Sequence, residues 1–354
     1  MSFDAVRVVR SFALCAFLFA GSAIGANAPP SPPVQPAHGP GSSEAKHGAV
    51  DARQIADGAQ GWWLFTPADP VPANAPVVVF CHGWGAMNPK GYRAWIDHIV
   101  RRGNIVVYPE YQDSLRTHPG DFLPNAIAAL HDAFAKLDSG TLGIRADVQR
   151  VAVVGHSAGG VLAAEIAAVG ESRGLPPIRA AMPVEPGDGS RGERHRASVP
   201  MLDLAPMPAD TLLLVVVGEE DFLAGEDLGL RVYDEARRLP ASNRNVVELR
   251  SDAHGTPPLI ANHAAPSAST TPLNRQASAE RMRLARWIAG PPDLRNAGAI
   301  DALDGYGTWK LFDALTDAGF YGTHRDMALG GSAAQTSMGV WSDGVPVTPM
   351  RVLR

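Results

Sequence analysis

Short apolar runs alternate along this chain with longer stretches in which apolar residues recur every three or four positions. Unbroken apolar runs of strand length are typical of strands buried on both faces of a sheet. They occupy residues 77–80, 105–108, 151–154, 178–182, 211–217 and 245–249. Apolar residues at 92, 95, 96, 99 and 100 predict an amphipathic helix, which Gly103 would end. Further helices are expected over 123–137, from the glycines after Ser157 to 169, and over 228–239 and 277–289.

This alternation predicts an α/β fold, with a mostly parallel central sheet and helices on both faces. Ligands of such sheets bind at the carboxyl ends of the strands, so residues that follow a strand are the candidates for chemistry. Residues 51–290 are expected to form this domain. Residues 291–354 carry Tyr306, Trp309 and Phe312 at helical spacing, which predicts a C-terminal extension packed on the same domain.

The N-terminus has the composition of an export signal. Arg7 and Arg10 precede an apolar stretch, and Ala26-Asn27-Ala28 resembles a cleavage site, so residues 1–28 are predicted to be a signal peptide. The apolar stretch is too short to cross a bilayer, and we expect an exported protein, periplasmic or secreted, without a stable membrane anchor. Residues 29–50 are rich in Pro, Gly and Ser, which predicts a flexible linker.

Charge and cysteine content narrow the classes of partner. The net charge is −5 and no basic run occurs, which argues against a nucleic-acid partner. Of the two cysteines, one lies in the predicted signal, and Cys81 at a strand end is expected to be a buried packing residue. No spacing typical of a metal site is present, so we expect no metal and no cofactor. The sequence gives no indication of the oligomeric state.

The stretch Gly155-His156-Ser157-Ala158-Gly159 lies between a predicted strand and a predicted helix. Glycines at these positions allow a sharp turn that exposes a serine at the helix N-terminus, as a nucleophile requires. Ser157 is therefore the candidate nucleophile. The alternative is an ordinary glycine turn that carries a surface serine.

Two loops could serve the chemistry at Ser157. His82-Gly83-Trp84-Gly85 follows a strand, and the backbone N–H of Trp84, with that of Ala158, could form an oxyanion hole. The alternative is a plain glycine turn. The side chains of Trp84, Met87 and Phe222 flank the oxyanion and acid loops and are predicted to be apolar walls of the substrate pocket.

A carboxylate and a histidine would complete the set. Asp221, in a loop after the strongest strand, is the first choice for the acid; Glu220 is the second, and Glu185 is less favoured. His254 follows the last strand and is the first choice for the base, with His263 as the alternative. His156 is expected to be structural.

With Ser157, Asp221 and His254 in this order, the chain resembles the α/β-hydrolase superfamily over about residues 60–290. The nearest branches are the dienelactone-hydrolase-like and polyester-hydrolase-like enzymes, on the strength of Cys-His-Gly-Trp-Gly, Gly-His-Ser-Ala-Gly-Gly, Gly-Glu-Glu-Asp and Asp-Ala-His-Gly. The resemblance implies that Ser157 is the nucleophile, His254 the base and Asp221 the acid, with Trp84 and Ala158 as oxyanion donors. The dienelactone enzymes use a cysteine nucleophile, and the serine here points to ester hydrolysis.

The function expected from these features is that of an exported serine hydrolase. It would cleave a small-molecule or polymeric carboxylic ester through an acyl-enzyme on Ser157. An acyltransferase or peptidase could use the same triad, and a non-catalytic binding protein on the same fold is an alternative from another class. Residues 184–209 form a charged, Pro-containing insertion that is either a rim or lid over the site or a solvated loop.

Overall fold

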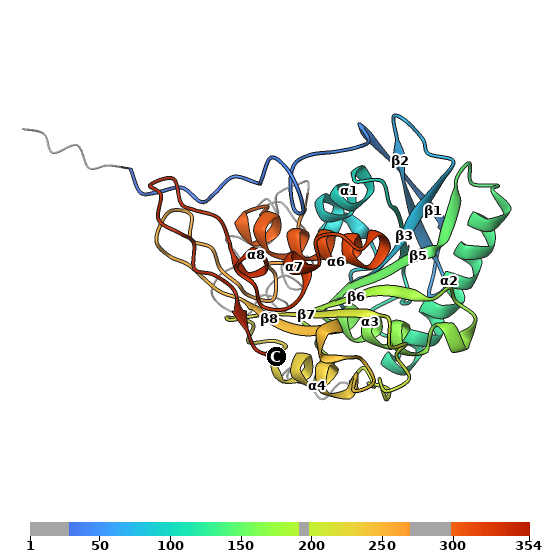
Figure 1. The fold of residues 1–354 in the computed structure, drawn as a ribbon. Coiled ribbons are helices and arrows are strands. Elements are labelled where there is room, and N and C mark those ends of the chain that lie inside the picture. The colour runs from blue at the N-terminus through green and yellow to red at the C-terminus, as the bar shows by residue number, and fades with distance from the viewer. Residues whose placement is uncertain (1–27, 191–197, 270–298) are drawn as a thin grey trace, which may run out of the picture.

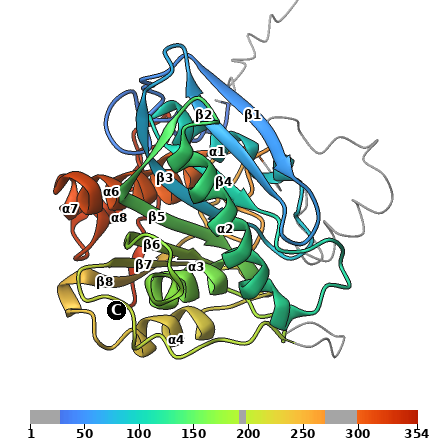
Figure 2. The ribbon, with the colours of Figure 1, turned by 90° about the vertical axis from the view of Figure 1, so that its right-hand side faces the viewer.

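A computed structural model describes residues 28–190, 198–269 and 299–354 of the chain. The predicted helix over 277–289 and all but the last residue of the predicted signal peptide lie outside these ranges. Within them the chain forms one mixed sheet with helices on both faces (Figures 1 and 2). The predicted α/β class is confirmed.

The sheet has the strand order β1-β2-β4-β3-β5-β6-β7-β8-β9. The six central strands, β4 to β8 in this order, are parallel, and β1, β2 and β9 add antiparallel edges. The bounds are β1 (Ala49–Ala56), β2 (Trp62–Ala68), β3 (Asn74–Cys81), β4 (Ile105–Pro109), β5 (Arg145–His156), β6 (Ile178–Val184), β7 (Leu212–Gly218), β8 (Arg244–Leu249) and β9 (Arg351–Val352). All six apolar runs of the sequence are strands of the parallel part.

Two hydrophobic clusters lie on opposite faces of the sheet. One face is covered by α1 (Arg93–Arg101) and α6 (Trp309–Tyr321), and the other by α2 (Phe122–Ser139), α3 (Ala158–Val169) and α4 (Asp227–Glu235) (Figures 1 and 2). Apart from Glu165, the helix α3 consists of glycine and apolar residues, and it is buried on all sides because the sheet, α2 and neighbouring segments enclose it. This enclosure fixes α3 directly behind the carboxyl end of β5.

Residues 29–48, which we call the N-terminal strap, pack on the rest of the molecule, so the prediction of a flexible linker is wrong. The Gly41 N–H donates to Asp313 Oδ2 on α6 over 2.7 Å. The Thr256 N–H donates to the Pro30 carbonyl, and the Ser31 N–H donates to Ser342 Oγ. The composition of the strap indicates only that it can bury little apolar surface. Hydrogen bonds of its backbone groups hold it in place, and these bonds cannot be predicted from composition.

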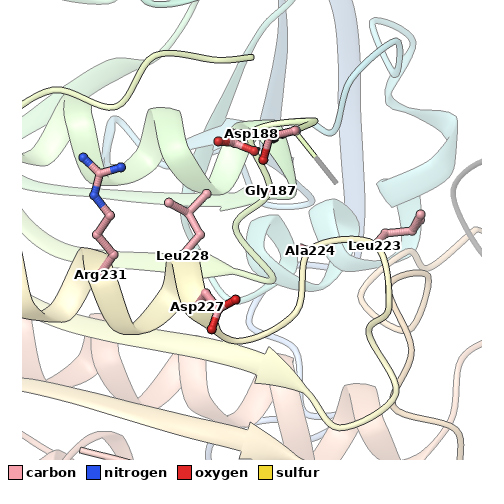
Figure 3. Close-up of a pocket in the computed structure, with 8 residues that line it drawn as sticks. Gly187, Asp188, Leu223, Ala224, Asp227, Leu228 and Arg231 are labelled. Carbon is pink, nitrogen blue, oxygen red and sulfur yellow. Dashed lines mark hydrogen bonds between the residues drawn. The ribbon is translucent and has the colours of Figure 1, made fainter. Parts of the chain in front are cut away.

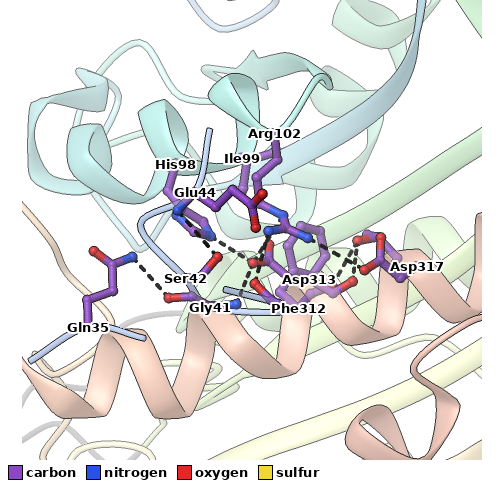
Figure 4. A network of polar contacts seen from close by, with 12 residues as sticks. Gln35, Gly41, Ser42, Glu44, His98, Ile99, Arg102, Phe312, Asp313 and Asp317 are labelled. Atoms are coloured by element: carbon purple, nitrogen blue, oxygen red, sulfur yellow. Dashed lines mark hydrogen bonds and ion pairs between the residues drawn. The ribbon is translucent and has the colours of Figure 1, made fainter. Parts of the chain in front are cut away.

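Asp313 is the centre of a buried polar network beneath the strap (Figure 4). Its carboxylate lies 2.8 Å from His98 Nε2 and 3.2 Å from Arg102 Nε, both on α1 or at its end. Burial would raise the pKa of Asp313, but the charges and hydrogen bonds of His98 and Arg102 outweigh it and hold that pKa below its usual range. The network therefore joins α1, α6 and the strap.

The C-terminal residues 299–354 pack on the α/β domain. After α6, the short helices α7 (Arg325–Ala328) and α8 (Ala333–Thr336) lead to β9, which pairs with β8. The buried Lys310 Nζ donates to the carbonyls of Gln335 and Ser337 and thereby fastens this segment to α6. Among the helices of the described ranges, none has the length and apolarity needed to cross a membrane.

Candidate active site

The predicted turn between β5 and α3 is a nucleophile elbow. Ser157 has φ 57° and ψ −123°, a conformation that a side-chain-bearing residue rarely adopts. A Cβ at Gly155 would lie 1.9 Å from the Gly159 carbonyl oxygen, and one at Gly159 would lie 2.2 Å from the Cys81 carbonyl oxygen. Only glycine fits at these two positions. They let the backbone pass close to β3 while Ser157 stays partly exposed at the helix start.

Three side chains form a continuous hydrogen-bonded set at this turn. Ser157 Oγ lies 2.9 Å from His263 Nε2, and His263 Nδ1 lies 2.8 Å from Asp221 Oδ2. The other oxygen of Asp221 accepts the N–H groups of Leu223 and Ala224, both over 2.9 Å. Because the carboxylate accepts from Nδ1–H, the lone pair of Nε2 faces the serine hydroxyl. This set can accept the serine proton and stabilise the resulting imidazolium.

The structure does not bring His254 to Ser157, and that prediction is corrected. The Nε2 atom of His254 lies 2.8 Å from Asp343 Oδ2 in the C-terminal segment, and the side chain is 36% exposed. The reason is the path of the chain after β8. Asp252 pairs with Leu259 in an antiparallel bridge, so the chain turns back before it reaches the site.

His263, the alternative base, follows the segment in which the chain turns back toward the sheet. Two backbone bonds fix the approach: the Glu220 N–H donates to the Ala261 carbonyl, and the Ala261 N–H donates to Ser251 Oγ. Both histidines satisfy the chain order and follow the last parallel strand, and the only sequence criterion that separated them, distance from the strand end, favoured His254. Of the two neighbouring acids, Asp221 rather than Glu220 contacts His263.

Glu185, the least favoured of the three candidate acids, lies beside the hydrogen-bonded set of Ser157, His263 and Asp221. It follows β6 with φ 45°, is fully buried, and has no hydrogen-bond partner for its carboxyl oxygens among the described residues. Its Oε2 lies 3.4 Å from His156 Nε2 and 3.7 Å from His263 Nδ1. Burial, reinforced by the charge of Asp221, raises the pKa of Glu185 well above its usual range. Both effects favour the neutral form of the Glu185 carboxyl group.

The same two histidines and Glu185 are the described group whose donor atoms approach one another as metal ligands would, within 4.8 Å. Each imidazole is already engaged, His263 Nδ1 with Asp221 and His156 Nε2 with the His263 carbonyl over 2.9 Å. A metal ion would have to replace both bonds. These contacts therefore favour a hydrogen-bonded site over a metal centre.

The predicted oxyanion loop lies beside Ser157. A Cβ at Gly83 would be 3.5 Å from Ser157 Cβ. The two residues that flank Trp84 are fixed, since the Gly83 N–H donates to Tyr92 Oη and the Gly85 N–H to Gln112 Oε1. Ala158 is the first residue of α3, so its N–H has no acceptor within the helix. The roles of Trp84 and Ala158 as donors remain predictions.

A pocket of about 220 Å³ adjoins the nucleophile (Figure 3). The Gly187 N–H donates to the Ser157 carbonyl, and a Cβ at Gly187 would lie 3.6 Å from Ser157 Oγ. Its lining mixes apolar with charged side chains: Gly187, Asp188, Ser190, Leu223, Ala224, Asp227, Leu228 and Arg231. Part of the 184–209 insertion therefore forms a wall of this pocket, while residues 191–197 lie outside the described ranges.

None of the three predicted pocket walls lines this pocket. The Trp84 indole is 7% exposed, packs edge-on against Phe122 and is covered by Gly189. Phe222 is 83% exposed, and Met87 is partly exposed. The three residues were chosen because they lie next to a functional loop in the sequence. The direction of a side chain depends instead on what it packs against in the folded protein.

The sheet order, the elbow and the Ser157–His263–Asp221 set define a serine hydrolase of the α/β-hydrolase type. The chain belongs to the chlorophyllase family, whose family model matches residues 35–219. The matched range holds Ser157 and the oxyanion loop and ends before Asp221 and His263. Membership places the chain among the serine ester hydrolases of this fold. A search of curated proteins gives no significant match.

Proposed function

We propose that this protein is an exported hydrolase of carboxylic esters that works through an acyl-enzyme on Ser157. The observation that carries the proposal is the pair of hydrogen bonds from Ser157 Oγ to His263 Nε2 and from His263 Nδ1 to Asp221 Oδ2, 2.9 and 2.8 Å long. Export rests on the sequence of residues 1–28.

In the first half-reaction, Ser157 Oγ attacks the ester carbonyl carbon while His263 Nε2 takes the hydroxyl proton. The carbonyl oxygen becomes an oxyanion, to which the N–H groups of Trp84 and Ala158 would donate. Each such donor is worth about 3 kcal/mol in the transition state. The intermediate collapses when His263 Nε2–H protonates the departing alkoxide, which leaves as an alcohol.

In the second half-reaction, water replaces the alcohol. His263 Nε2 removes a proton from the water, whose oxygen attacks the acyl carbon, and the proton is then returned to Ser157 Oγ as the acid leaves. Throughout, Asp221 holds the imidazole by Nδ1–H and stabilises its charged form. The pocket beside Gly187 lies where one arm of the ester would extend, since Gly187 contacts Ser157.

The test uses a fluorophosphonate probe and nitrophenyl esters of graded acyl length on the mature protein, beside Ser157→Ala. We expect labelling and turnover in the wild type and neither in the variant. Labelling that persists in Ser157→Ala would exclude Ser157 as the nucleophile, and a wild type that neither labels nor turns over would support a binding protein on this fold. Export is tested by the N-terminal residue of the secreted or periplasmic protein, expected at position 29.

A further inference from the structure

Two buried side chains outside the triad join the two loops that flank Ser157. The Gly83 N–H of the oxyanion loop donates to Tyr92 Oη over 3.0 Å. Tyr92 Oη lies 2.8 Å from His156 Nδ1, and His156 Nε2 lies 2.9 Å from the carbonyl oxygen of His263. Tyr92 is 4% and His156 2% exposed, so water does not compete for these bonds. The chain of bonds thus runs from one side of the nucleophile to the other.

The direction of every proton in this chain is determined. A backbone N–H can only donate, so Tyr92 Oη accepts from Gly83 and has its own hydrogen for His156 Nδ1. The His263 carbonyl can only accept, so His156 carries a proton on Nε2, and in the neutral ring Nδ1 accepts from the Tyr92 hydroxyl. Burial, with the proximity of the His263 ring, lowers the pKa of His156 well below its usual range, which favours the neutral ring. Glu185 Oε2 also faces His156 Nε2, at 3.4 Å, and burial favours the neutral form of that carboxyl group.

The chain of bonds passes close to the reacting serine. A Cβ at Gly83 would lie 3.0 Å from Tyr92 Oη and 3.5 Å from both His156 Nδ1 and Ser157 Cβ. His156 is also the residue before Ser157, and its ring centroid is 4.7 Å from that of His263. Tyr92 is held in turn by the ring of Phe80, whose centroid is 5.1 Å away. A shift at any of these groups therefore moves either the oxyanion loop or the base.

We propose that Tyr92 and His156 are positioning residues that hold the Trp84 N–H and the His263 ring at fixed positions on either side of Ser157. The inference rests on the proposed ester hydrolysis and adds two residues to it, neither of which touches the reacting atoms. Gly83 immediately precedes Trp84, so the bond to Tyr92 holds the backbone on one side of the Trp84 N–H, while the Gly83 carbonyl in the same peptide unit as that N–H accepts from the Ala86 N–H over 3.0 Å. The bond from His156 sets the backbone of His263 independently of Asp221, which sets its ring.

Four variants test the proposal by steady-state kinetics on a nitrophenyl ester and by thermal melting. Tyr92→Phe and His156→Leu break the chain of bonds, and His156→Gln keeps one acceptor and one donor on a side chain of similar reach. Thr211→Val is the matched control: it removes a buried hydroxyl that donates to the Ile178 carbonyl over 2.8 Å at the far ends of β6 and β7.

We expect kcat to fall about 10- to 100-fold in Tyr92→Phe and His156→Leu with KM changed less than about threefold, since a misplaced donor loses part of its effect in the transition state only. His156→Gln should keep kcat within about fivefold, and Thr211→Val should lower Tm without changing kcat. The rate of fluorophosphonate labelling should follow kcat.

Unchanged kcat in folded Tyr92→Phe, or a His156→Gln variant as slow as His156→Leu, would overturn the inference. A loss of kcat in Thr211→Val equal to that in Tyr92→Phe would show a general effect of stability and would overturn it too. If His156→Leu does not fold, Tyr92→Phe decides. A wild type without turnover or labelling would instead refute the proposed function, so the two failures are distinguishable.

Discussion

The assignment of the base can be tested by two histidine substitutions with opposite expected results. In His263→Ala, the 2.9 Å bond to Ser157 Oγ and the 2.8 Å bond to Asp221 Oδ2 are both lost. Without the base the serine hydroxyl is not activated, and we expect kcat/KM to fall at least about 10⁴-fold, or about 5.5 kcal/mol at 1.36 kcal/mol per tenfold.

In His254→Ala, the pair with Asp343 and the contact with the Trp341 ring, whose centroid is 5.7 Å away, are lost, and the side chains of His254 and Asp343 are more than a third exposed. Water and salt screen an exposed pair of this kind, so its loss should lower Tm only slightly, with kcat/KM unchanged.

The assay is hydrolysis of a short-chain nitrophenyl ester, with circular dichroism melting of each variant. Asp343→Asn is the matched control, because it weakens the same surface pair and leaves both imidazoles in place. Loss of turnover in folded His254→Ala but not in Asp343→Asn would refute the structural assignment and restore His254 as the base. Turnover retained in His263→Ala would refute it as well.

Three further predictions concern buried carboxyls. Asp221→Asn should lower kcat about 10³- to 10⁴-fold. Burial favours the neutral form of Glu185, so Glu185→Gln should keep kcat within about threefold, and kinetics that reverse the two results would make Glu185 the acid. Asp313→Asn should lower the free energy of unfolding at pH 7, because the pKa of Asp313 is lower in the folded than in the unfolded protein. The stability that the carboxylate contributes is present above the unfolded pKa and is lost as the pH falls through the folded pKa. The free energy of unfolding in urea should therefore vary less between pH 5 and pH 3 in the variant than in the wild type, and an equal pH dependence would contradict this. Burial raises the pKa of Glu165 to about 7. The protonated side chain therefore contributes stability that is fully present below the unfolded pKa and is lost as the pH rises through 7. Glu165→Gln should raise the free energy of unfolding by about 1–3 kcal/mol over the wild type at pH 8 and leave it unchanged at pH 4, and equal increases at both pH values would refute the reasoning.

The parallel part of the sheet could be predicted from the sequence because its strands are buried on both faces. Each such strand is an unbroken apolar run, and all six runs became strands of the parallel core. The edges could not be predicted in the same way. Strand β1 is half-exposed and begins in a segment whose composition resembles a linker, and β9 has two residues. Edge strands of this kind depend on a partner strand more than on their own pattern.

The elbow was also determined locally. Gly155, Ser157 and Gly159 belong to one turn between adjacent elements, and the steric demands of that turn are met by residues two positions apart. The same holds for Asp221, which directly follows β7. Where an element and its functional residue are neighbours in sequence, the pattern was sufficient.

Only the tertiary structure decided between His254 and His263. Both follow β8, both come after Asp221, and the nearer one to the strand end was the better choice on sequence grounds. The Asp252–Leu259 bridge and the bond from Glu220 to Ala261 turn the loop back, so the more distant histidine reaches Ser157. Only the tertiary structure likewise showed the packing of the N-terminal strap, the burial of Glu185 and the bonds of Tyr92 and His156. Each depends on contacts between residues far apart in the chain, which no local pattern records.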